Sequence, residues 1–365
     1  MRFILILSVS AIFITGLVMI FSTSSAEVLD HDLDLNTHYA LYRQIVFAIL
    51  GCTIATATWW IGYRTILQFS PILLAALTLL LLLVLIPGIG REVNGSHRWL
   101  SLGGISIQPS EFAKLLIPLF YIQQVRSIEI SSVSFPDFLK FLIPMGIPTF
   151  LILIEPDNGT VFVIGSIMLM LFVLSRVPAK YWGVPLLVCV LVGGFSAYQL
   201  SYVSARLKVY LNPELDIKGK GHQPHQAKIA AGSGKMLGKG PGNSWQKLSY
   251  LPEAQNDYIA AIYAEEFGFL GIVTLVLLYM TLCYLGFSIA HHAATLAGFY
   301  LSAMVIFLIG FQAFLNLGVV SGLLPSTGLN LPFFSQGGSS LIANLIAIGL
   351  LISVRDDKKQ LEARV

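Results

Sequence analysis

The stretch that decides the fold class runs from Phe69 to Gly88 and reads Phe-Ser-Pro-Ile-Leu-Leu-Ala-Ala-Leu-Thr-Leu-Leu-Leu-Leu-Leu-Val-Leu-Ile-Pro-Gly, without one charged side chain. About 20 such residues in a helix span the hydrocarbon core of a bilayer. Further apolar stretches of similar length lie near 2–22, 41–61, 109–125, 137–155, 159–177, 182–202, 261–290, 297–323 and 339–354. The sequence therefore predicts an all-α polytopic membrane protein with about ten transmembrane helices.

Composition excludes a soluble protein. Of 365 residues, 56% are hydrophobic and 11% are charged, whereas soluble domains are about 25% charged. We expect a single integral membrane domain over 1–365, with one long loop at 203–256 between spans seven and eight. The first apolar run is longer than a signal-peptide core, which favours a retained helix. The three cysteines lie in apolar runs without ligand spacing, so neither a disulfide framework nor a zinc site is predicted.

Lysine and arginine in the short loops predict the orientation. If the N-terminus is cytoplasmic, the loops at Arg64, Arg126 and Arg176 and the basic C-terminal tail are cytoplasmic as well. The opposite side then receives an acidic segment at 27–34 and the long loop. Long loops escape the positive-inside rule, so the basic character of this one does not reverse the assignment. Both termini are predicted to be cytoplasmic.

Charged residues fall inside a predicted span at Glu111 and Lys114. Intramembrane charges are costly and usually pair or face a cavity. Their i, i+3 spacing permits pairing on one helix face. Two interpretations stay open: a buried ion pair that fixes helix packing, or a polar site.

The turn from Glu155 to Gly159 also carries two acids, Glu155 and Asp157. Turn residues between two helices explain its composition, and Asp157 is a candidate N-cap of the following helix. A functional role for Asp157 is the other interpretation.

The loop residues 232–244 are rich in glycine and lysine. No Ser or Thr follows Lys235 or Lys239, so the segment does not match the Walker motif of a phosphate-binding loop. Backbone N–H groups and lysines could still bind anions. Alternatively, the loop is solvated and lies over anionic lipid headgroups.

The end of the loop offers a candidate base. Pro252 suits the first position of a helix. A helix beginning there would place Glu253 and Asp257 on one face, where each carboxylate raises the pKa of the other. A carboxylate with a raised pKa serves as a base near neutral pH. The alternative is acidic capping of a helix N-terminus.

Taken together, several motifs resemble those of the SEDS family of cell-wall polymerases, over nearly the whole chain. The stretch Gly242-Asn243-Ser244-Trp245-Gln246-Lys247-Leu248 with Tyr250-Leu251-Pro252-Glu253 resembles the division branch rather than the elongation branch. The other matching segments are Val93-Asn94-Gly95, Arg98-Trp99, Gln108-Pro109-Ser110-Glu111-Phe112-Ala113-Lys114, Asp157-Asn158-Gly159-Thr160, Leu323-Leu324-Pro325-Ser326-Thr327-Gly328, Leu331-Pro332-Phe333-Phe334-Ser335 and Gly337-Gly338-Ser339-Ser340.

The resemblance implies a peptidoglycan glycosyltransferase of the bacterial inner membrane that uses lipid II. The family's essential Asp lies in a stretch commonly read as Pro-Glu-x-His-Thr-Asp-Phe, which maps it onto Asp257. The chain departs from that pattern at Gln255, Asn256 and Tyr258, so a role for the family's His is not carried over.

For this chemistry we expect Asp257 to be the base for the acceptor hydroxyl, with inversion by a single displacement. Arg98, Lys247 and Lys114 are expected near the diphosphate, whose growing charge needs cations. The remaining candidate substrate contacts are Glu111, Asp157, Glu253 and Ser339. A divalent cation such as Mg²⁺ or Mn²⁺ could assist the transfer, but the sequence shows no cluster of metal-ligand residues.

Two other functions stay open from the sequence. A lipid II flippase would line a passage with Glu111 and Lys114, and a scaffold would only hold a transpeptidase partner. The resemblance implies a class B penicillin-binding transpeptidase and other division proteins as partners, besides membrane lipid. No nucleic-acid partner is expected.

Overall fold

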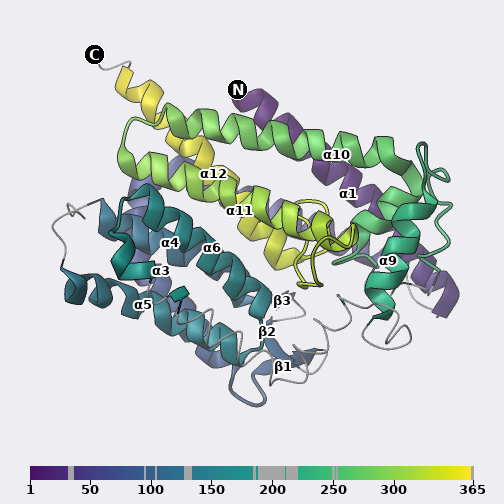
Figure 1. Cartoon of the computed structure of the whole chain (residues 1–365), viewed down its shortest axis with the longest axis horizontal. Helices are drawn as coiled ribbons and strands as arrows, with labels where there is room; N and C mark the ends of the chain where they lie inside the picture. Colours follow the sequence, from purple (N-terminus) through teal and green to yellow (C-terminus); the bar gives the residue numbers. More distant parts are fainter. Residues whose placement is uncertain are drawn as a thin grey trace. The chain divides into compact units, whose positions relative to one another are not determined.

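A computed structural model describes residues 1–31, 37–93, 96–102, 105–126, 134–183, 186–187, 210, 221–248, 251 and 254–362 of the chain. The described part is mostly helical, as predicted (Figure 1). Its helices are α1 (Arg2–His31), α2 (Tyr39–Ile61), α3 (Tyr63–Val84), α4 (Pro109–Val125), α5 (Phe135–Ile154), α6 (Asn158–Leu174), α9 (His222–Ser233), α10 (Ile259–His291), α11 (Leu296–Val320) and α12 (Gly338–Glu362).

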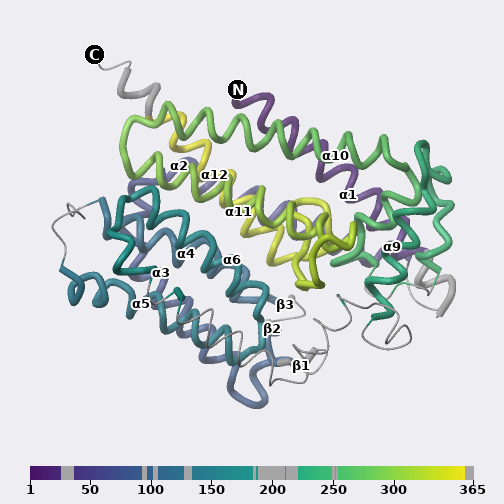
Figure 2. The backbone as a smooth tube through the Cα atoms, viewed as in Figure 1, coloured from purple at the N-terminus to yellow at the C-terminus, as the bar shows by residue number. Residues whose placement is uncertain are grey.

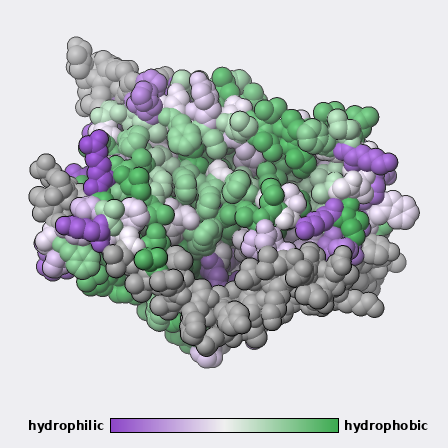
Figure 3. All heavy atoms as spheres, viewed as in Figure 1, coloured by the Kyte–Doolittle hydropathy of each residue, from purple (hydrophilic) through white to green (hydrophobic). Residues whose placement is uncertain are grey.

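Seven helices of the described chain are long and apolar enough to cross a membrane, namely α1, α2, α3, α5, α10, α11 and α12. Helices α4 and α6 match two further predicted spans but have only 17 residues each. Most of the predicted span at 182–202, and much of the long loop, lie outside the described residues. Figure 3 shows hydrophobic side chains over much of the visible face along α10 and α11, as lipid contact requires.

The chain divides into two compact units. The first contains Met1–Val46, Leu186–Leu282 and Gly310–Gly337, and the second contains Phe47–Pro185, Cys283–Ile309 and Gly338–Val365.

In the second unit, α4 is the central helix. It packs against α3, α5, α6 and α12, and most of its residues are buried. Pro109 occupies the first turn, where its missing N–H costs nothing, and Glu111 follows in the same turn. Because neighbours surround α4, its polar side chains must find partners within the protein.

The second unit also contains a three-stranded antiparallel sheet that the all-α prediction missed. Strands β1 (Gly90–Val93), β2 (Ser96–Leu102) and β3 (Ile105–Ile107) pair in that order, with Leu100 opposite Ile107. The strands have four, seven and three residues, which is too short for a clear alternating pattern. Strand β2 carries Arg98, one of the predicted site residues.

In the first unit, α10 is broken at Gly268, whose φ is 67°. The backbone groups released by this break are paired by the glycine-rich segment, which we define as residues 234–248. The bonds run from Phe269 N to Lys235 O (2.8 Å), from Leu270 N to Met236 O (3.2 Å), from Lys239 N to Glu265 O (2.9 Å) and from Gly240 N to Glu266 O (3.0 Å). The break therefore leaves these backbone groups satisfied, as an apolar surrounding demands.

Two glycines make this close approach possible. A Cβ at Gly268 would lie 2.3 Å from the backbone N of Gly238, and a Cβ at Gly238 would lie 2.1 Å from the carbonyl oxygen of Glu266. Both glycines also have a positive φ, which L-residues with a side chain adopt only with strain.

We predict that Gly268→Ala destabilises the protein by about 2–5 kcal/mol, because it combines a positive φ with a backbone clash. Gly165→Ala in α6 is the matched control, since a Cβ at Gly165 meets nothing within 4 Å. The control should be neutral or slightly stabilising. Thermal unfolding of both variants in detergent measures the difference; equal melting temperatures would contradict the proposed backbone pairing.

Candidate functional site

Asp257 lies in the first unit, half-buried in a turn immediately before α10. The predicted helix start at Pro252 is wrong, because residues 254–258 form turns and the helix begins at Ile259. Asp257 therefore lies in a turn rather than on a helix. Glu253 lies outside the described residues, so its pairing with Asp257 stays a prediction.

Tertiary hydrogen bonds explain the late helix start. The carbonyl of Asp257 accepts from Asn316 Nδ2 at 2.8 Å, and the carbonyl of Gln255 accepts from the backbone N of Gln336 at 3.0 Å. In a helix that began at Pro252, each of these carbonyls would instead accept a hydrogen bond from the backbone N–H four residues further along the chain. The turn is thus held in place by α11 and by the connector that follows it.

The connector between α11 and α12, residues 321–337, forms the wall opposite the Asp257 carboxylate. A Cβ at Gly328 would lie 3.8 Å from Asp257 Oδ2, so the backbone at Gly328 faces the carboxylate. Asn316 Nδ2 also donates to Leu329 O at 2.8 Å, which joins the turn of Asp257 to the connector. Figure 2 follows the connector, in yellow-green, as it folds back on itself at the end of α11.

Buried polar side chains make this connector rigid. Gln44 donates to Ser335 O at 3.4 Å and accepts from Gly337 N at 3.3 Å. Ser335 Oγ accepts from Leu331 N at 2.9 Å. Phe333 adopts a φ of 64°, a strained value that persists only where the surroundings enforce it. Asn316 and Gln44 were missed by the sequence reasoning, although polar residues in apolar helices are a recognisable signal.

Lys247, predicted to contact a diphosphate, is instead buried against the protein. Its Nζ donates to Glu266 Oε1 at 2.8 Å, Ser22 Oγ at 2.9 Å and Gly242 O at 2.7 Å. An ammonium has three donors, and all three have acceptors here. These bonds anchor the glycine-rich segment, and the contact of Lys247 with a diphosphate stays a prediction.

In the second unit, Asp157 is the centre of a hydrogen-bonded cluster. Its Oδ1 accepts from Thr160 N at 3.2 Å, which confirms the predicted N-cap of α6. Its Oδ2 accepts from Ser110 Oγ at 3.0 Å and Gln108 Nε2 at 3.3 Å. The backbone N of Gln108 donates to Ser339 Oγ at 2.9 Å, so Ser339 joins the same cluster.

Arg98 and Glu155 lie beside this cluster. Arg98 donates from Nε to the Glu155 carbonyl and from Nη2 to the Pro156 carbonyl, both at 2.8 Å. The Glu155 carboxyl is 1% exposed, and neither oxygen has a hydrogen-bond partner in the described part of the chain. Burial, and secondly the charge of Asp157, raise the pKa of Glu155 from its ordinary 4.5 to about 8, against the smaller opposing effect of Arg98.

Glu111 and Lys114 form the predicted ion pair, with Lys114 Nζ 2.7 Å from Glu111 Oε2. On α4, Lys114 is buried and the Glu111 side chain is 12% exposed. The pairing is therefore confirmed, while a contact of either residue with substrate stays a prediction. Because each charge neutralises the other, the pair is compatible with an architectural role.

The described residues contain no group of three or more His, Cys, Asp or Glu side chains placed to hold a metal ion. A divalent cation that assists the reaction stays a prediction.

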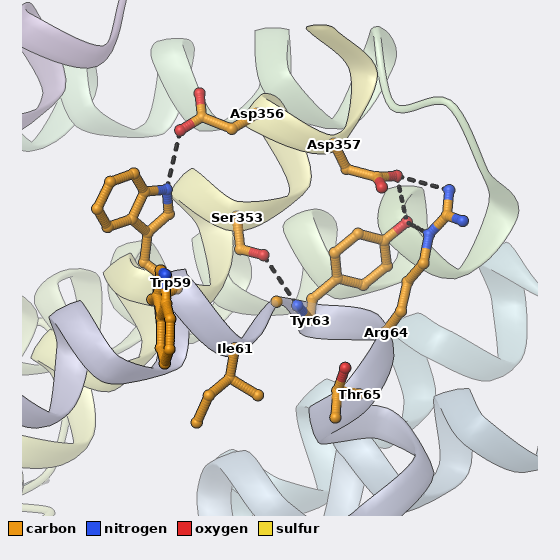
Figure 4. A pocket seen from close by; sticks show the side chains of 10 residues that line it. Trp59, Ile61, Tyr63, Arg64, Thr65, Ser353, Asp356 and Asp357 are labelled. Atoms are coloured by element: carbon orange, nitrogen blue, oxygen red, sulfur yellow. Dashed lines mark hydrogen bonds and ion pairs between the residues drawn. The ribbon is translucent and has the colours of Figure 1, made fainter. Parts of the chain in front are cut away.

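A cavity of about 310 Å³ lies elsewhere in the second unit, where the turn between α2 and α3 meets α12 (Figure 4). Its polar side chains bind one another. Trp59 Nε1 donates to Asp356, Arg64 Nη2 lies 2.7 Å from Asp357, and Tyr63 N donates to Ser353 Oγ. These contacts fasten the turn onto α12 and do not resemble a built ligand site.

Comparison with known proteins identifies relatives over nearly the full chain. A family model described as "Cell cycle protein" (FTSW_RODA_SPOVE) matches residues 2–360. The chain is 40% identical over 360 residues to "Probable peptidoglycan glycosyltransferase FtsW" of Thioalkalivibrio sulfidiphilus, covering 96% of this chain and 88% of that protein. It is 36% identical over 359 residues to the protein of the same name from Trichlorobacter lovleyi, covering 96% and 92%.

Two solved structures are similar as well. One, described as "Structural coordination of polymerization and crosslinking by a peptidoglycan synthase complex", superposes with a TM-score of 0.77 at 29% identity and covers 98% of both chains. The other is the rod shape determining protein RodA of Thermus thermophilus, with a TM-score of 0.69 at 28% identity, covering 97% of this chain and 96% of that one.

We predict that Glu155→Gln weakens the pH dependence of stability. A folded-state pKa near 8 means that the folded protein holds the proton more tightly than the unfolded chain. The wild type should therefore lose stability as pH rises from about 4.5 to about 8, by a few kcal/mol at most. Melting temperatures of the wild type and Glu155→Gln across this range test it. Asp137→Asn, an exposed acid on α5, should keep the wild-type slope.

We predict that exchanging the charges of Glu111 and Lys114 preserves more folded protein than changing either residue alone. A single change leaves one buried charge without its partner, which is the costly state. Size-exclusion yield of Glu111→Lys, Lys114→Glu and the double variant measures the effect. Equal losses in all three variants would instead indicate separate roles for the two side chains.

Proposed function

Because the chain belongs to the FtsW/RodA/SpoVE family of cell cycle proteins, we propose that it is a peptidoglycan glycosyltransferase of the FtsW type, acting in cell division. Relatives with this name align with 93–98% of the chain. The match to the family model over residues 2–360 includes the turn of Asp257 and the cluster around Asp157.

The proposed substrate is lipid II, a sugar diphosphate carried on a polyprenol. Polymerisation joins an acceptor hydroxyl to an anomeric carbon and breaks the bond from that carbon to the lipid diphosphate. The diphosphate is a good leaving group that needs cationic stabilisation more than a protonating acid. The acceptor hydroxyl needs a base within hydrogen-bond reach. One carboxylate is therefore sufficient, and attack in a single displacement inverts the anomeric centre.

The observation that carries the proposal is the placement of Asp257. Its carboxylate faces the connector at Gly328, while its backbone is tied to Asn316 on α11. A base must be held in a fixed orientation by groups that are themselves fixed. Asn316 is 2% exposed and binds both the Asp257 turn and the connector, which supports Asp257 as the general base.

The three predicted diphosphate contacts stay predictions, and the contacts of each side chain bear on them separately. Lys247 donates to Glu266, and Lys114 is paired with Glu111. Arg98 is half-buried and donates to two backbone carbonyls rather than to a carboxylate. Arg98 is therefore the strongest candidate of the three, and Asp157 and Ser339 belong to the cluster beside it.

The flippase alternative depended on Glu111 and Lys114 lining a passage. Their mutual pairing within one helix removes the main reason for it. The decisive experiment is glycan-strand synthesis from purified lipid II in detergent, because a flippase has no activity without a membrane to cross.

We also propose that the protein lies in the bacterial inner membrane with both termini cytoplasmic and Asp257 on the outer side. The basic short loops support this orientation. Membrane-impermeant labelling of a cysteine at position 92, but not at position 64, in intact cells is the expected result. The reverse pattern would overturn the orientation and the access of Asp257 to exported substrate.

The proposed partner is a class B penicillin-binding transpeptidase. The similar structure of a peptidoglycan synthase complex supports a partner of this kind. Co-purification of the two proteins from the native membrane, and synthesis rates with and without the transpeptidase, test this assembly.

We predict that Asp257→Asn lowers polymerisation by about 10²–10⁴-fold, because the amide keeps the size of the side chain but cannot take a proton. Asp137→Asn is the matched control, since Asp137 is an exposed acid paired with Lys140, and it should polymerise at the wild-type rate. Strand length and rate are measured on purified protein, with melting temperature on the same preparation. A wild-type rate for Asp257→Asn shows that another group is the base.

A further inference from the structure

The glycine-rich segment exposes large apolar side chains although it is a connection between helices. Met236 is 60% exposed, Leu237 77% and Trp245 68%. Lys235, adjacent to Met236, is exposed as well. A loop surrounded by water does not gather several large apolar side chains without a contact that covers them.

The backbone of this segment is joined to a membrane-spanning helix. Lys235 O accepts from Phe269 N at 2.8 Å, and Met236 O accepts from Leu270 N at 3.2 Å. Met236 and its neighbour Leu237 therefore lie directly beside the point where the long half of α10 begins.

That point is the end of the lipid-facing stripe of α10. Phe269, Leu270, Leu277 and Met280 are all more than half exposed. At about 100° per residue, Leu270, Leu277 and Met280 all lie within about 100° of Phe269 around the helix, so the four side chains share one side. Since α10 is long and apolar enough to span a bilayer, this stripe contacts lipid.

Ion pairs to two buried glutamates hold the segment in this position. Lys247 lies 2.8 Å from Glu266 in a buried pair, and the more exposed Lys239 lies 2.5 Å from Glu265. Ser244 Oγ also donates to Glu265. Removing one partner of a buried pair leaves an uncompensated charge, which is costly, so we expect the segment and the start of α10 to move together.

We propose that the glycine-rich segment is a membrane-inserted wedge, with Met236, Leu237 and Trp245 in the boundary between headgroups and acyl chains of the leaflet beside α10. Tryptophan favours that boundary, and apolar burial there is favourable. Lys235 lies among the headgroups, where anionic lipid attracts it. The occupant of the exposed patch is thus lipid. The inference concerns contact with the membrane and does not depend on the proposed chemistry.

The wedge has a consequence for Asp257. The short half of α10, Ile259–Phe267, connects the wedge to the turn of Asp257, over about 13 Å of helix. Because this half is bonded to the segment at Glu265 and Glu266, the position of the wedge in the leaflet constrains the position of the turn.

Spin labels test the wedge. Cys52, Cys189 and Cys283 are first replaced by alanine, and single cysteines are then placed at Met236, Leu277 or Glu92. The three side chains are similarly exposed, at 60%, 55% and 61%. Leu277 is the lipid reference, and Glu92, on β1, is the aqueous reference. The protein is reconstituted in vesicles of phosphatidylcholine with phosphatidylglycerol, and accessibility to oxygen and to a nickel chelate is measured.

The wedge predicts that the oxygen-to-nickel accessibility ratio at position 236 is close to that at 277 and several-fold above that at 92. A label at Leu237 provides a second position if the first variant folds poorly. A ratio at both positions equal to that at 92 overturns the proposal and assigns the patch to a protein partner. Lys235→Gln should reduce the effect of phosphatidylglycerol on the ratio; an unchanged effect removes the headgroup contact from the proposal.

Discussion

The structure depends on one constraint: inside an apolar surrounding, a backbone N–H or C=O must find a partner within the protein. The break of α10 at Gly268 shows how the chain meets it. A continuous helix would pair its own backbone groups. In the broken helix, backbone N–H groups after the break donate to the carbonyls of Lys235 and Met236, and carbonyls before it accept from the N–H groups of the glycine-rich segment. Only glycine at positions 268 and 238 allows the two backbones to come this close. The glycine content of this part of the loop is therefore a packing requirement rather than a sign of a phosphate-binding loop.

The same constraint governs charged side chains. The buried Lys247 and Lys114 each pair with a carboxylate, and the buried Glu265 pairs with Lys239, so an opposite charge offsets the cost of burial. Glu155 is the exception, since its buried carboxyl has no hydrogen-bond partner among the described residues. Burial, and secondly the charge of Asp157, disfavour its ionised form, so its pKa is raised to about 8. Lys114, Lys239 and Lys247, which the sequence alone leaves as candidate cations, are thus paired within the protein.

Much of the fold follows from contiguous sequence. The apolar stretch at 109–125 corresponds to α4, Pro109–Val125, and the i, i+3 spacing of Glu111 and Lys114 led to their ion pair. Asp157 was recognised as an N-cap from its position in the turn. These predictions succeed because hydropathy, helical periodicity and capping depend on residues within one or two turns of each other. The short sheet was missed because its strands are too brief to show a period.

The sequence by itself determined that this protein lies in a membrane and where most of its helices run, because both depend on local composition. It also determined the family, because the family's motifs occur in order along the chain. The tertiary structure decided what the polar residues do. Asn316 reaches the Asp257 turn across 59 positions, Lys247 reaches Ser22 across 225, and Ser339 reaches Gln108 across 231. Partners so distant in sequence leave no periodic signal. The helix start at Ile259, the anchoring role of Lys247 and the cluster around Asp157 therefore became visible only when the folded chain brought those groups within hydrogen-bonding distance.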